Sequence, residues 1–283
     1  MESGIKTLRA PAKINLCLHV LGRLESGYHE VAMAMQAVDL FDDITITPDR
    51  AGTIVVDCPG LELNEGDENI AARAARLLCE RSGVQAGFRI RIRKKIPAAA
   101  GLGGGSSDAA TVLVGLNDLL GLGLDRQSLA GLAAELGADV SFFIYGGAAW
   151  ATGIGTELQP LVGLPRVAYL LVNPGIAVST AEIYQSLRLT KGGELANLPR
   201  FSVATADELC AALHNDLEPP AFRRFPQIAE IKQELIAGGA MGALMSGSGS
   251  TVFGVYDDYE TAIRAGEAFA GRTGWQAFPV RPL

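Results

Sequence analysis

The stretch "KKIPAAAGLGGGSSDAATVLVGLN", residues 94–117, places a run of glycines and two serines directly in front of an apolar segment. Glycine costs roughly 0.5–1 kcal/mol relative to alanine inside regular structure, so such a cluster needs a structural reason. Two explanations are open: a flexible turn between a strand and a helix, or a loop whose backbone N–H groups approach a ligand closely. A helix N-terminus offers free N–H groups and a partial positive charge. The residue types therefore favour phosphate binding.

The loop does not follow the common phosphate-binding patterns. The P-loop pattern G-x-x-x-x-G-K-[ST] is excluded because no lysine follows the glycines. The dinucleotide-binding pattern G-x-G-x-x-G, if it started at Gly101, would need glycine at the position of Ser106, so it is excluded too. The esterase pattern G-x-S-x-G is absent from the chain. Asp108 suits the first turn of a helix, but it would repel a phosphate unless a metal ion lay between them.

Composition narrows the class of protein. With 283 residues, 48% hydrophobic and 19% charged, the chain is long enough for one large or two ordinary globular domains. The net charge of −7 argues against a nucleic-acid partner, and the basic stretch at residues 89–95 is typical of a solvated strand face. The longest uncharged run, residues 235–256, is rich in glycine and serine, so no membrane span is expected.

Cysteine usage and the first residues indicate a cytoplasmic protein. The four cysteines are scattered without C-x-x-C spacing, and the three histidines lie far apart, so neither a disulfide framework nor a zinc site is predicted. Scattered free cysteines are typical of a reducing compartment. Residues 1–13 contain no apolar segment of the kind found in signal peptides.

Hydrophobic periodicity predicts alternating strands and helices. Residues 13–20, "KINLCLHV", alternate as a strand with one buried face, and residues 88–92 alternate in the same way. Helices are predicted at residues 67–83, 106–120 and 125–137, with Asp125 as an N-cap and Gly137 as a stop. The segment 138–153 is expected to begin as a strand with Asp139 at its start.

The second half of the sequence is also predicted to contain both strands and helices. A strand near residues 164–175 is followed by helices at 180–187, 205–214 and 227–237, a strand–loop–strand at 240–256 and a last helix at 259–271. Strands interleaved with helices favour an α+β or α/β fold, with a domain boundary near residues 157–164.

Two short stretches have more than one interpretation. "LMSGSGSTVFG", residues 244–254, is either a hairpin turn or a loop that packs closely against a ligand or another loop. Asp139 in "GADVSFF" is a solvated or capping turn residue, or a functional carboxylate.

Four stretches together resemble the GHMP kinase family. "PAAAGLGGGSSDAA", residues 97–110, is similar to its phosphate loop, and "MSGSGSTVFG", residues 245–254, to its C-terminal glycine motif. Residues 10–31 and 137–158 resemble the members that act on methylerythritol carrying a cytidine diphosphate, in the non-mevalonate isoprenoid pathway. The resemblance runs in order from about residue 8 to residue 256. One departure is Ser141, where proline is expected.

The resemblance implies a fold and an activity. The fold is the two-domain α+β GHMP kinase fold, with a mixed-sheet domain and its glycine-rich loop at residues 1–158 and a ferredoxin-like domain at 159–283. The activity is ATP-dependent phosphorylation of the 2-hydroxyl of the methylerythritol unit. Lys13 and Asp139 would be the catalytic pair, with Asp139 accepting the hydroxyl proton and Lys13 holding the carboxylate charged. Without the resemblance, Lys13 is an exposed strand lysine.

The resemblance also implies binding residues. ATP, with Mg²⁺, would be held by Pro97, Ala98, Ala99, Ala100, Gly101, Leu102, Gly103, Gly104, Gly105, Ser106 and Ser107. The metal ligands stay open among Ser106, Ser107 and Asp108. The substrate and its cytidine would contact Asn15, Tyr28, His29, Thr180 and Tyr184. Tyr28 and Tyr184 would sandwich the cytosine, and His29 would donate or accept hydrogen bonds; Tyr184 is alternatively a core aromatic.

Two competing functions remain at this level. One is a GHMP kinase for another small alcohol, such as homoserine or mevalonate, which has no base to stack. The other is a non-catalytic relative that binds a metabolite. The expected partner is a small molecule, with neither nucleic acid nor membrane, and the oligomeric state is open.

Overall fold

The computed structural model describes residues 4–61, 68–187 and 201–283. By contacts the chain forms two compact units that interleave along the sequence. The first unit takes residues up to Ala12, Leu40–Ala98 and Gly103–Gly146, and the second takes Lys13–Asp39, Ala99–Leu102 and Gly147–Leu283. The long strands β1 (Lys6–Arg23) and β2 (His29–Asp49) contribute residues to both units. The division into residues 1–158 and 159–283 stays a prediction.

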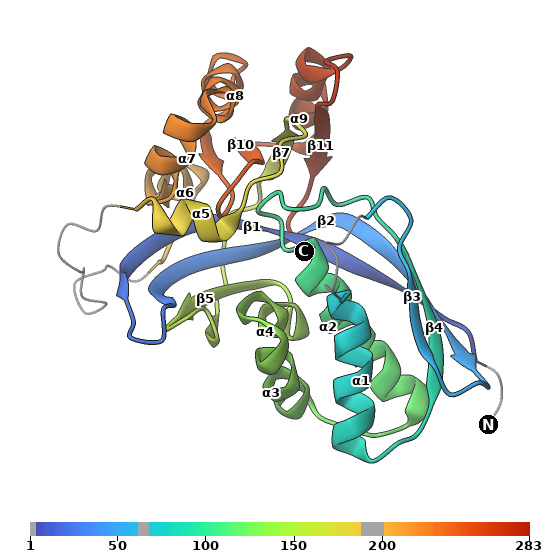
Figure 1. The fold of residues 1–283 in the computed structure, drawn as a ribbon. Helices are drawn as coiled ribbons and strands as arrows, with labels where there is room; N and C mark the ends of the chain where they lie inside the picture. Colours follow the sequence, from blue (N-terminus) through green and yellow to red (C-terminus); the bar gives the residue numbers. More distant parts are fainter. Residues whose placement is uncertain (1–3, 62–67, 188–200) are drawn as a thin grey trace. The chain divides into compact units, whose positions relative to one another are not determined.

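The first unit is a sheet covered by helices. The C-terminal part of β2 pairs antiparallel with β4 (Gly87–Arg93), and β3 (Ile54–Asp57) pairs parallel with β4. Helices cover one face of this sheet (Figure 1). They are α1 (Ile70–Ser82), α2 (Gly104–Leu120), α3 (Arg126–Leu136) and α4 (Ala138–Tyr145). Apolar side chains of the sheet and the helices form one core between them.

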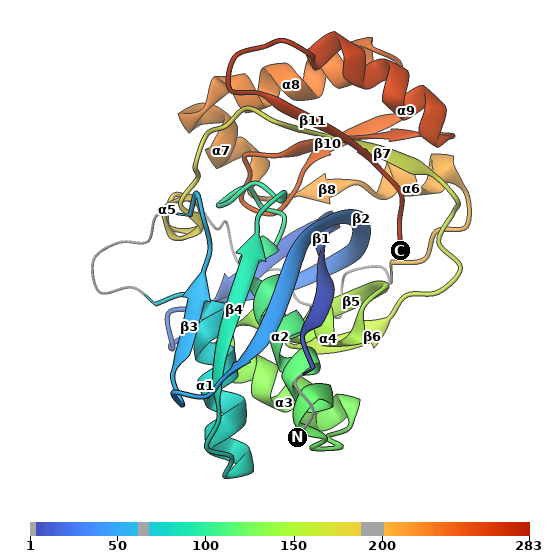
Figure 2. The ribbon, with the colours of Figure 1, turned by 90° about the vertical axis from the view of Figure 1, so that its right-hand side faces the viewer.

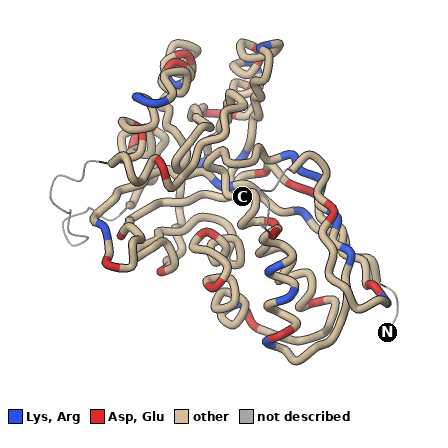
Figure 3. Tube along the Cα trace, in the orientation of Figure 1, with Lys and Arg blue, Asp and Glu red and all other residues tan. Residues whose placement is uncertain are grey.

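Strand β4 confirms the predicted alternation. Phe88, Ile90 and Ile92 are buried against the helices, while the arginines between them are exposed. Figure 3 shows basic and acidic residues mixed along β3 and β4. Arg91 Nε on β4 lies 3.6 Å from Asp57 Oδ2 on β3. The three arginines of the basic stretch therefore form a solvated strand face, as predicted, but Lys94 does not, because its side chain is largely buried beside Asp42 and Asp108.

The second unit contains a four-stranded antiparallel sheet. Its order is β11 (Gln276–Val280), β7 (Ala168–Asn173), β10 (Val252–Tyr256), β9 (Gly242–Met245). Helices α8 (Pro226–Ala237) and α9 (Tyr259–Gly266, followed by the 3₁₀ turn Glu267–Phe269) lie on one face (Figure 2). Apart from the elements inserted between β7 and α8, the chain runs β7, α8, β9, β10, α9, β11, which gives a ferredoxin-like topology and confirms that prediction.

Shorter elements complete the second unit. The N-terminal part of β2 pairs with β5 (Ala148–Thr152), and β5 pairs with β6 (Glu157–Pro160). The C-terminal part of β1 pairs parallel with β8 (His214–Asn215). The remaining α-helices within the residues that the structure describes are α5 (Thr180–Gln185), α6 (Ala206–Ala212) and α7 (Glu218–Arg224).

Helix ends follow the predicted signals closely. Gly83 ends α1 in the left-handed conformation, and Asp125 caps α3 by accepting from Ser128 N–H. Helix α2 begins at Gly104, two residues earlier than predicted, because Gly103 takes the N-cap position with φ +69°. Residue 67, the predicted start of the first helix, lies outside the described residues.

The prediction that residues 13–20 have one buried face is wrong. The side chains of Lys13, Asn15 and Cys17 are buried as well, with 4%, 0% and 2% exposure. The second face of β1 is covered by other parts of the same unit: Asn15 N–H donates to Ser246 Oγ, and the Asn15 amide contacts Met33 Sδ. Periodicity identifies a strand, but it does not reveal what covers the polar face.

The prediction that the segment after Gly137 starts as a strand is also wrong. Residues Ala138–Tyr145 form α4, with Asp139 in its first turn. An acidic residue is favoured there because the helix N-terminus carries partial positive charge. The run "VSFFIY" is apolar on all sides, so its periodicity does not separate a buried helix from a strand.

Helix α7 and strand β11 were not predicted either, and Pro219 and Pro220 start α7.

In the part of the chain that the structure describes, no helix has both the length and the apolar character needed to cross a bilayer.

Candidate active site

The glycine loop contains backbone conformations that residues with a Cβ rarely adopt. Gly101 and Gly103 have φ values of +76° and +69°, and Ala99 has φ +48°. Gly103 directly precedes α2 and has no side chain to cap the first N–H groups of that helix. The loop therefore presents backbone N–H groups in front of a helix, as the sequence predicts for an anion site.

Within the second unit, residues 99–102 pack against the hairpin of residues 246–251 that joins β9 to β10. Ser246 Oγ donates to the Gly101 carbonyl at 2.9 Å, and Thr251 N–H donates to the Ala100 carbonyl at 3.2 Å. Both interpretations of "MSGSGSTVFG" hold in part, because the segment is a hairpin and also packs closely against another loop. The two glycine motifs are thus parts of one structure.

Lys13 and Asn15 lie beside these two loops. Lys13 N–H donates to the Leu102 carbonyl at 3.0 Å, and Asn15 N–H donates to Ser246 Oγ at 3.2 Å. Lys13 Nζ donates to Asn15 Oδ1 at 2.5 Å. A Cβ atom added to Gly247 would lie 3.3 Å from Asn15 Oδ1. The structure therefore brings a buried ammonium group, its amide partner and both glycine motifs together.

Thr180 joins the same group of residues from α5. Its hydroxyl lies 2.8 Å from Ser248 Oγ in the hairpin. Just before the helix, Val178 N–H donates to the Ala99 carbonyl at 3.3 Å. The start of α5 is therefore anchored to both glycine motifs.

The aromatic residues expected at the cytidine have a specific arrangement. The rings of His29 and Tyr184 lie 4.9 Å apart with an angle of 39° between their planes. Tyr28 is 63% exposed. Burial, together with the nearby Arg23, lowers the pKa of His29 below its usual value, which favours a neutral imidazole. A neutral ring both donates and accepts hydrogen bonds.

Asn215 was not predicted, yet it supports the hairpin. Its side chain is buried and donates to the carbonyls of Met245 and Gly247, at 2.7 and 2.8 Å. Its Oδ1 accepts from Leu217 N–H at 2.9 Å. No local pattern around "HND" signals this role, because the partners lie about thirty residues away in sequence.

In the first unit, Lys94 is shared by two buried carboxylates. Its Nζ contacts Asp42 Oδ2 and lies 2.8 Å from Asp108 Oδ2. Burial raises the pKa of Asp108 to about 7; Lys94 opposes this increase, and Asp42 adds to it. Burial acts to lower the pKa of Lys94, but Asp108 and Asp42 outweigh it and raise that pKa. Asp108 directly follows the glycine loop, but the expectation that it lies in the first turn of its helix is wrong: α2 begins at Gly104, so Asp108 falls beyond the first turn.

Asp139 is half-buried in the first turn of α4, in the same unit. Two residues on, the side chain of Ser141 donates to the Ala130 carbonyl of α3 at 3.0 Å. Serine at this position, where the resemblance leads us to expect proline, therefore ties α4 to α3.

Comparison with known proteins identifies the family. The family model "GHMP kinases N terminal domain" matches residues 69–147, and "GHMP kinases C terminal" matches residues 195–273. A curated relative from Syntrophotalea carbinolica, named 4-diphosphocytidyl-2-C-methyl-D-erythritol kinase, is 58% identical over 99% of both chains. A relative of the same name from Geobacter sp. (strain M21) is 51% identical over 98% of both chains.

The chain belongs to the GHMP kinase family.

Solved structures of GHMP kinases agree with this assignment. A crystal structure of 4-(cytidine 5'-diphospho)-2C-methyl-D-erythritol kinase has a TM-score of 0.81 and 39% identity, covering 98% of this chain and 99% of that one. A homoserine kinase from Cytophaga hutchinsonii has a TM-score of 0.75 at 19% identity, covering 99% and 96%, and shares the fold alone. The predicted family and the predicted α+β GHMP kinase fold are both confirmed.

Proposed function

We propose that this GHMP kinase transfers the γ-phosphoryl group of ATP to the 2-hydroxyl of 4-diphosphocytidyl-2-C-methyl-D-erythritol, a step of the non-mevalonate isoprenoid pathway. The observation that carries the proposal is the 58% identity, over 99% of both chains, to a relative named for this kinase. The presence of both Lys13 and Asp139 supports an enzyme rather than a non-catalytic binding protein.

For ATP we propose the loop Pro97–Ser107. Positive φ values at Ala99, Gly101 and Gly103 turn the backbone, and the N-terminus of α2 adds its partial charge. When bound, ATP supplies the phosphoryl group, and Mg²⁺ compensates the negative charge of the phosphates. Ser246 and Thr251 hold the loop from the second glycine motif, so its shape is set before ATP arrives.

The residues at the start of α2 fit a magnesium ion. Ser107 Oγ and Asp108 Oδ1 are buried and have no hydrogen-bond partner among the described residues. A buried unpaired oxygen is costly unless a ligand satisfies it. Hydroxyl and carboxylate oxygens are ligands that Mg²⁺ prefers. We therefore propose Ser107 and Asp108 as metal-binding residues, with the half-buried Ser106 as an alternative.

Asp139 is proposed to accept the proton of the substrate hydroxyl. A carboxylate serves as the base in this type of phosphoryl transfer because the hydroxyl oxygen becomes a better nucleophile as it loses its proton. Lys13 is proposed to orient the substrate hydroxyl through its ammonium group. Asn15 fixes that group at 2.5 Å, which limits the positions that the lysine side chain can take.

Tyr28, His29, Thr180 and Tyr184 are proposed to bind the cytidine diphosphate part of the substrate. The contact between the rings of His29 and Tyr184 offers an aromatic surface for the base, and base stacking contributes about 1–3 kcal/mol. Thr180, bonded to Ser248, offers a hydroxyl near the glycine hairpin. Homoserine and mevalonate have no base, so a kinase for either would gain nothing from these rings.

The experiment is an ADP-release assay with ATP and Mg²⁺, comparing 4-diphosphocytidyl-2-C-methyl-D-erythritol, homoserine and mevalonate as acceptors. The cytidine substrate is expected to have a kcat/KM higher than the other two by a factor on the order of 10² or more. If homoserine or mevalonate is turned over preferentially, the proposed substrate is wrong, while the proposed kinase activity stands. Saturable binding of an acceptor without ADP release in the presence of any of the three would favour the non-catalytic alternative.

A further inference from the structure

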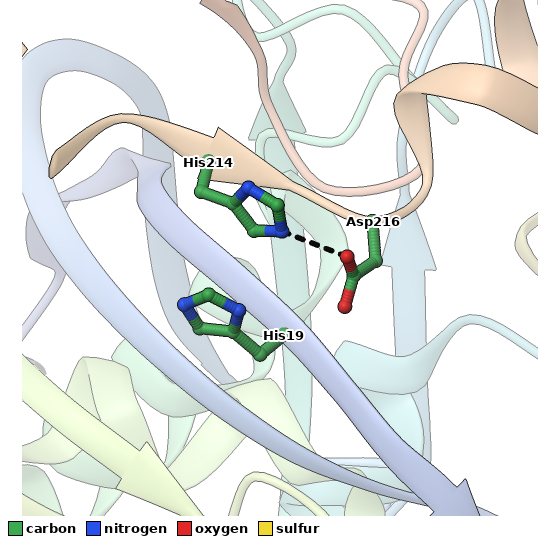
Figure 4. Close-up of side chains that lie close together, drawn as sticks. All are labelled: His19, His214 and Asp216. Atoms are coloured by element: carbon green, nitrogen blue, oxygen red, sulfur yellow. Dashed lines mark hydrogen bonds and ion pairs between the residues drawn. The ribbon is translucent and has the colours of Figure 1, made fainter. Parts of the chain in front are cut away.

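A second polar cluster lies in the same unit, at the point where β8 pairs with β1. Figure 4 shows the side chains of His19, His214 and Asp216 facing one another. The two imidazole rings are stacked, with centroids 4.5 Å apart and 17° between their planes. His214 Nε2 lies 2.7 Å from Asp216 Oδ1. The proposed kinase activity gives these three residues no role.

The backbone holds the cluster in place. Asp216 Oδ2 accepts from Val20 N–H at 2.7 Å, and Asp216 N–H donates to the Leu18 carbonyl at 3.0 Å. The parallel pairing of Leu18 with Asn215 fixes the register of β8 against β1. His19 and Asp216 therefore keep their separation even without any direct bond between their side chains.

The hydrogen bonds of the cluster leave one of its rings open to a cation. Both carboxylate oxygens of Asp216 have a partner: Oδ2 accepts from Val20 N–H, and Oδ1 lies 2.7 Å from His214 Nε2. The side chain of His19 makes no hydrogen bond within the described residues. The cluster thus contains an imidazole whose nitrogens have no hydrogen-bond partner among the described residues, beside a carboxylate and a second imidazole.

We propose that His19, His214 and Asp216 bind a zinc-type divalent cation. One ligand atom from each residue lies within 4.8 Å of the others. Ligand bonds of about 2.0–2.1 Å in a tetrahedral site separate neighbouring ligands by about 3.3 Å, so modest side-chain rotations bring the three atoms to binding distance. Two imidazoles and one carboxylate form an open zinc site that leaves a fourth position for water. The metal replaces the proton between His214 and Asp216, which passes to solvent.

The ligand set selects among cations. Imidazole nitrogen favours Zn²⁺, Co²⁺ and Ni²⁺ over Mg²⁺ and Ca²⁺, which prefer oxygen ligands. Cys17 lies on the same face of β1 as His19 and is buried, but its sulfur is not among the ligand atoms that lie within 4.8 Å of one another. The proposed site therefore differs in chemistry from the magnesium ligands proposed near Ser107.

The test is titration of the full, metal-stripped chain with ZnCl₂ by calorimetry, and with CoCl₂ by visible absorption. One equivalent is expected to bind, and His19→Gln and His214→Gln are each expected to weaken binding at least ~10-fold. His19→Gln removes a ring contact but no side-chain hydrogen bond, so circular dichroism without metal is expected to match that of the unaltered protein.

Two control variants distinguish zinc binding at this site from zinc binding elsewhere on the chain. His29→Gln removes the third histidine of the chain, and Cys17→Ser removes the nearby thiol; both are expected to keep full zinc affinity. A thermal midpoint that rises with ZnCl₂ in the unaltered chain and not in His19→Gln adds support. The proposal is overturned if no equivalent binds, if His19→Gln binds as tightly as the unaltered chain, or if Cys17→Ser abolishes binding. None of these readouts depends on kinase activity.

Discussion

A Cβ atom added to Gly101 would lie 1.9 Å from the carbonyl oxygen of Ser246. Gly101 has φ +76°, a conformation that residues with a Cβ rarely adopt, and its own carbonyl accepts from Ser246 Oγ. The two glycine motifs, 145 residues apart, therefore meet with no room for a side chain.

We expect Gly101→Ala to lower the free energy of unfolding by about 1–3 kcal/mol, because the added methyl group must displace backbone. Denaturant unfolding measures this. Gly105→Ala is the matched control, since Gly105 lies within α2 and, among the described residues, its added Cβ meets only Ile70 Cγ2, at 3.7 Å. Equal stability of the two variants would show that the contact between the motifs is not tight.

Asn215→Ala is expected to reduce both stability and kinase turnover. The variant leaves the buried carbonyls of Met245 and Gly247 without their donor, at about 1–3 kcal/mol for each unsatisfied group. The hairpin then loses its support beneath the glycine loop. Asn117→Ala is the control, because Asn117 also bonds the backbone through both ends of its side-chain amide, in its case to the carbonyl and the N–H of Leu124 in the first unit.

The distinguishing measurement for Asn215 is the ratio of turnover loss to stability loss. Asn117→Ala is expected to lose stability but to keep its kcat and KM at temperatures where it is folded. If both variants lose turnover in proportion to stability, Asn215 has a general structural role and no specific one at the hairpin.

Stability is expected to depend on pH through Asp108. Its pKa in the folded protein is about 7, against 3.8 for an ordinary carboxyl group, because burial disfavours the charge and Asp42 lies close by. Between these values the folded state holds more protons than the unfolded state. The free energy of unfolding therefore falls as pH rises from about 4 to about 7, by at most about 1.4 kcal/mol per pH unit.

Denaturant unfolding at several pH values, without Mg²⁺, checks this contribution. Asp108→Asn carries no charge and is expected to flatten the profile in that window. Asp118→Asn is the control, because Asp118 is an exposed acid on the same helix, paired with Lys6. An unchanged slope in Asp108→Asn would mean that Asp108 is ionised throughout.

Asp139→Asn is expected to lower kcat by a factor on the order of 10²–10⁴ with little change in ATP affinity, because the amide does not accept the hydroxyl proton. Steady-state kinetics and equilibrium ATP binding measure the two effects separately. Asp125→Asn, at the exposed cap of α3, keeps the capping hydrogen bond and is expected to leave turnover unchanged. Turnover within a few fold of the unaltered enzyme would exclude Asp139 as the base.

Tyr184→Ala is expected to raise the KM for the cytidine substrate far more than the KM for ATP. The loss of stacking corresponds to roughly 1–3 kcal/mol, or about a 5- to 150-fold change in affinity. Tyr184→Phe keeps the ring beside His29 and is expected to retain most of the affinity. If alanine leaves the substrate KM unchanged, the ring belongs to the core and does not contact the base.

Local patterns predicted much of the fold. The ends of α1 and α3 followed from Gly83 and Asp125, since capping depends on a few adjacent residues. The buried face of β4 followed from its alternation. The apolar run after Gly137 was misread as a strand, because a segment that is apolar all round has no periodicity to distinguish helix from strand.

The sequence by itself determined the residue types of the phosphate loop, the family and the identity of the expected catalytic pair, because these depend on short motifs in order along the chain. The tertiary structure alone decided that Gly101 meets Ser246, that the polar face of β1 is buried, and that Asn215 supports the hairpin. It also brought His19 to within ring contact of His214. Contacts between residues so far apart in sequence depend on the path of the whole backbone, which no local pattern specifies.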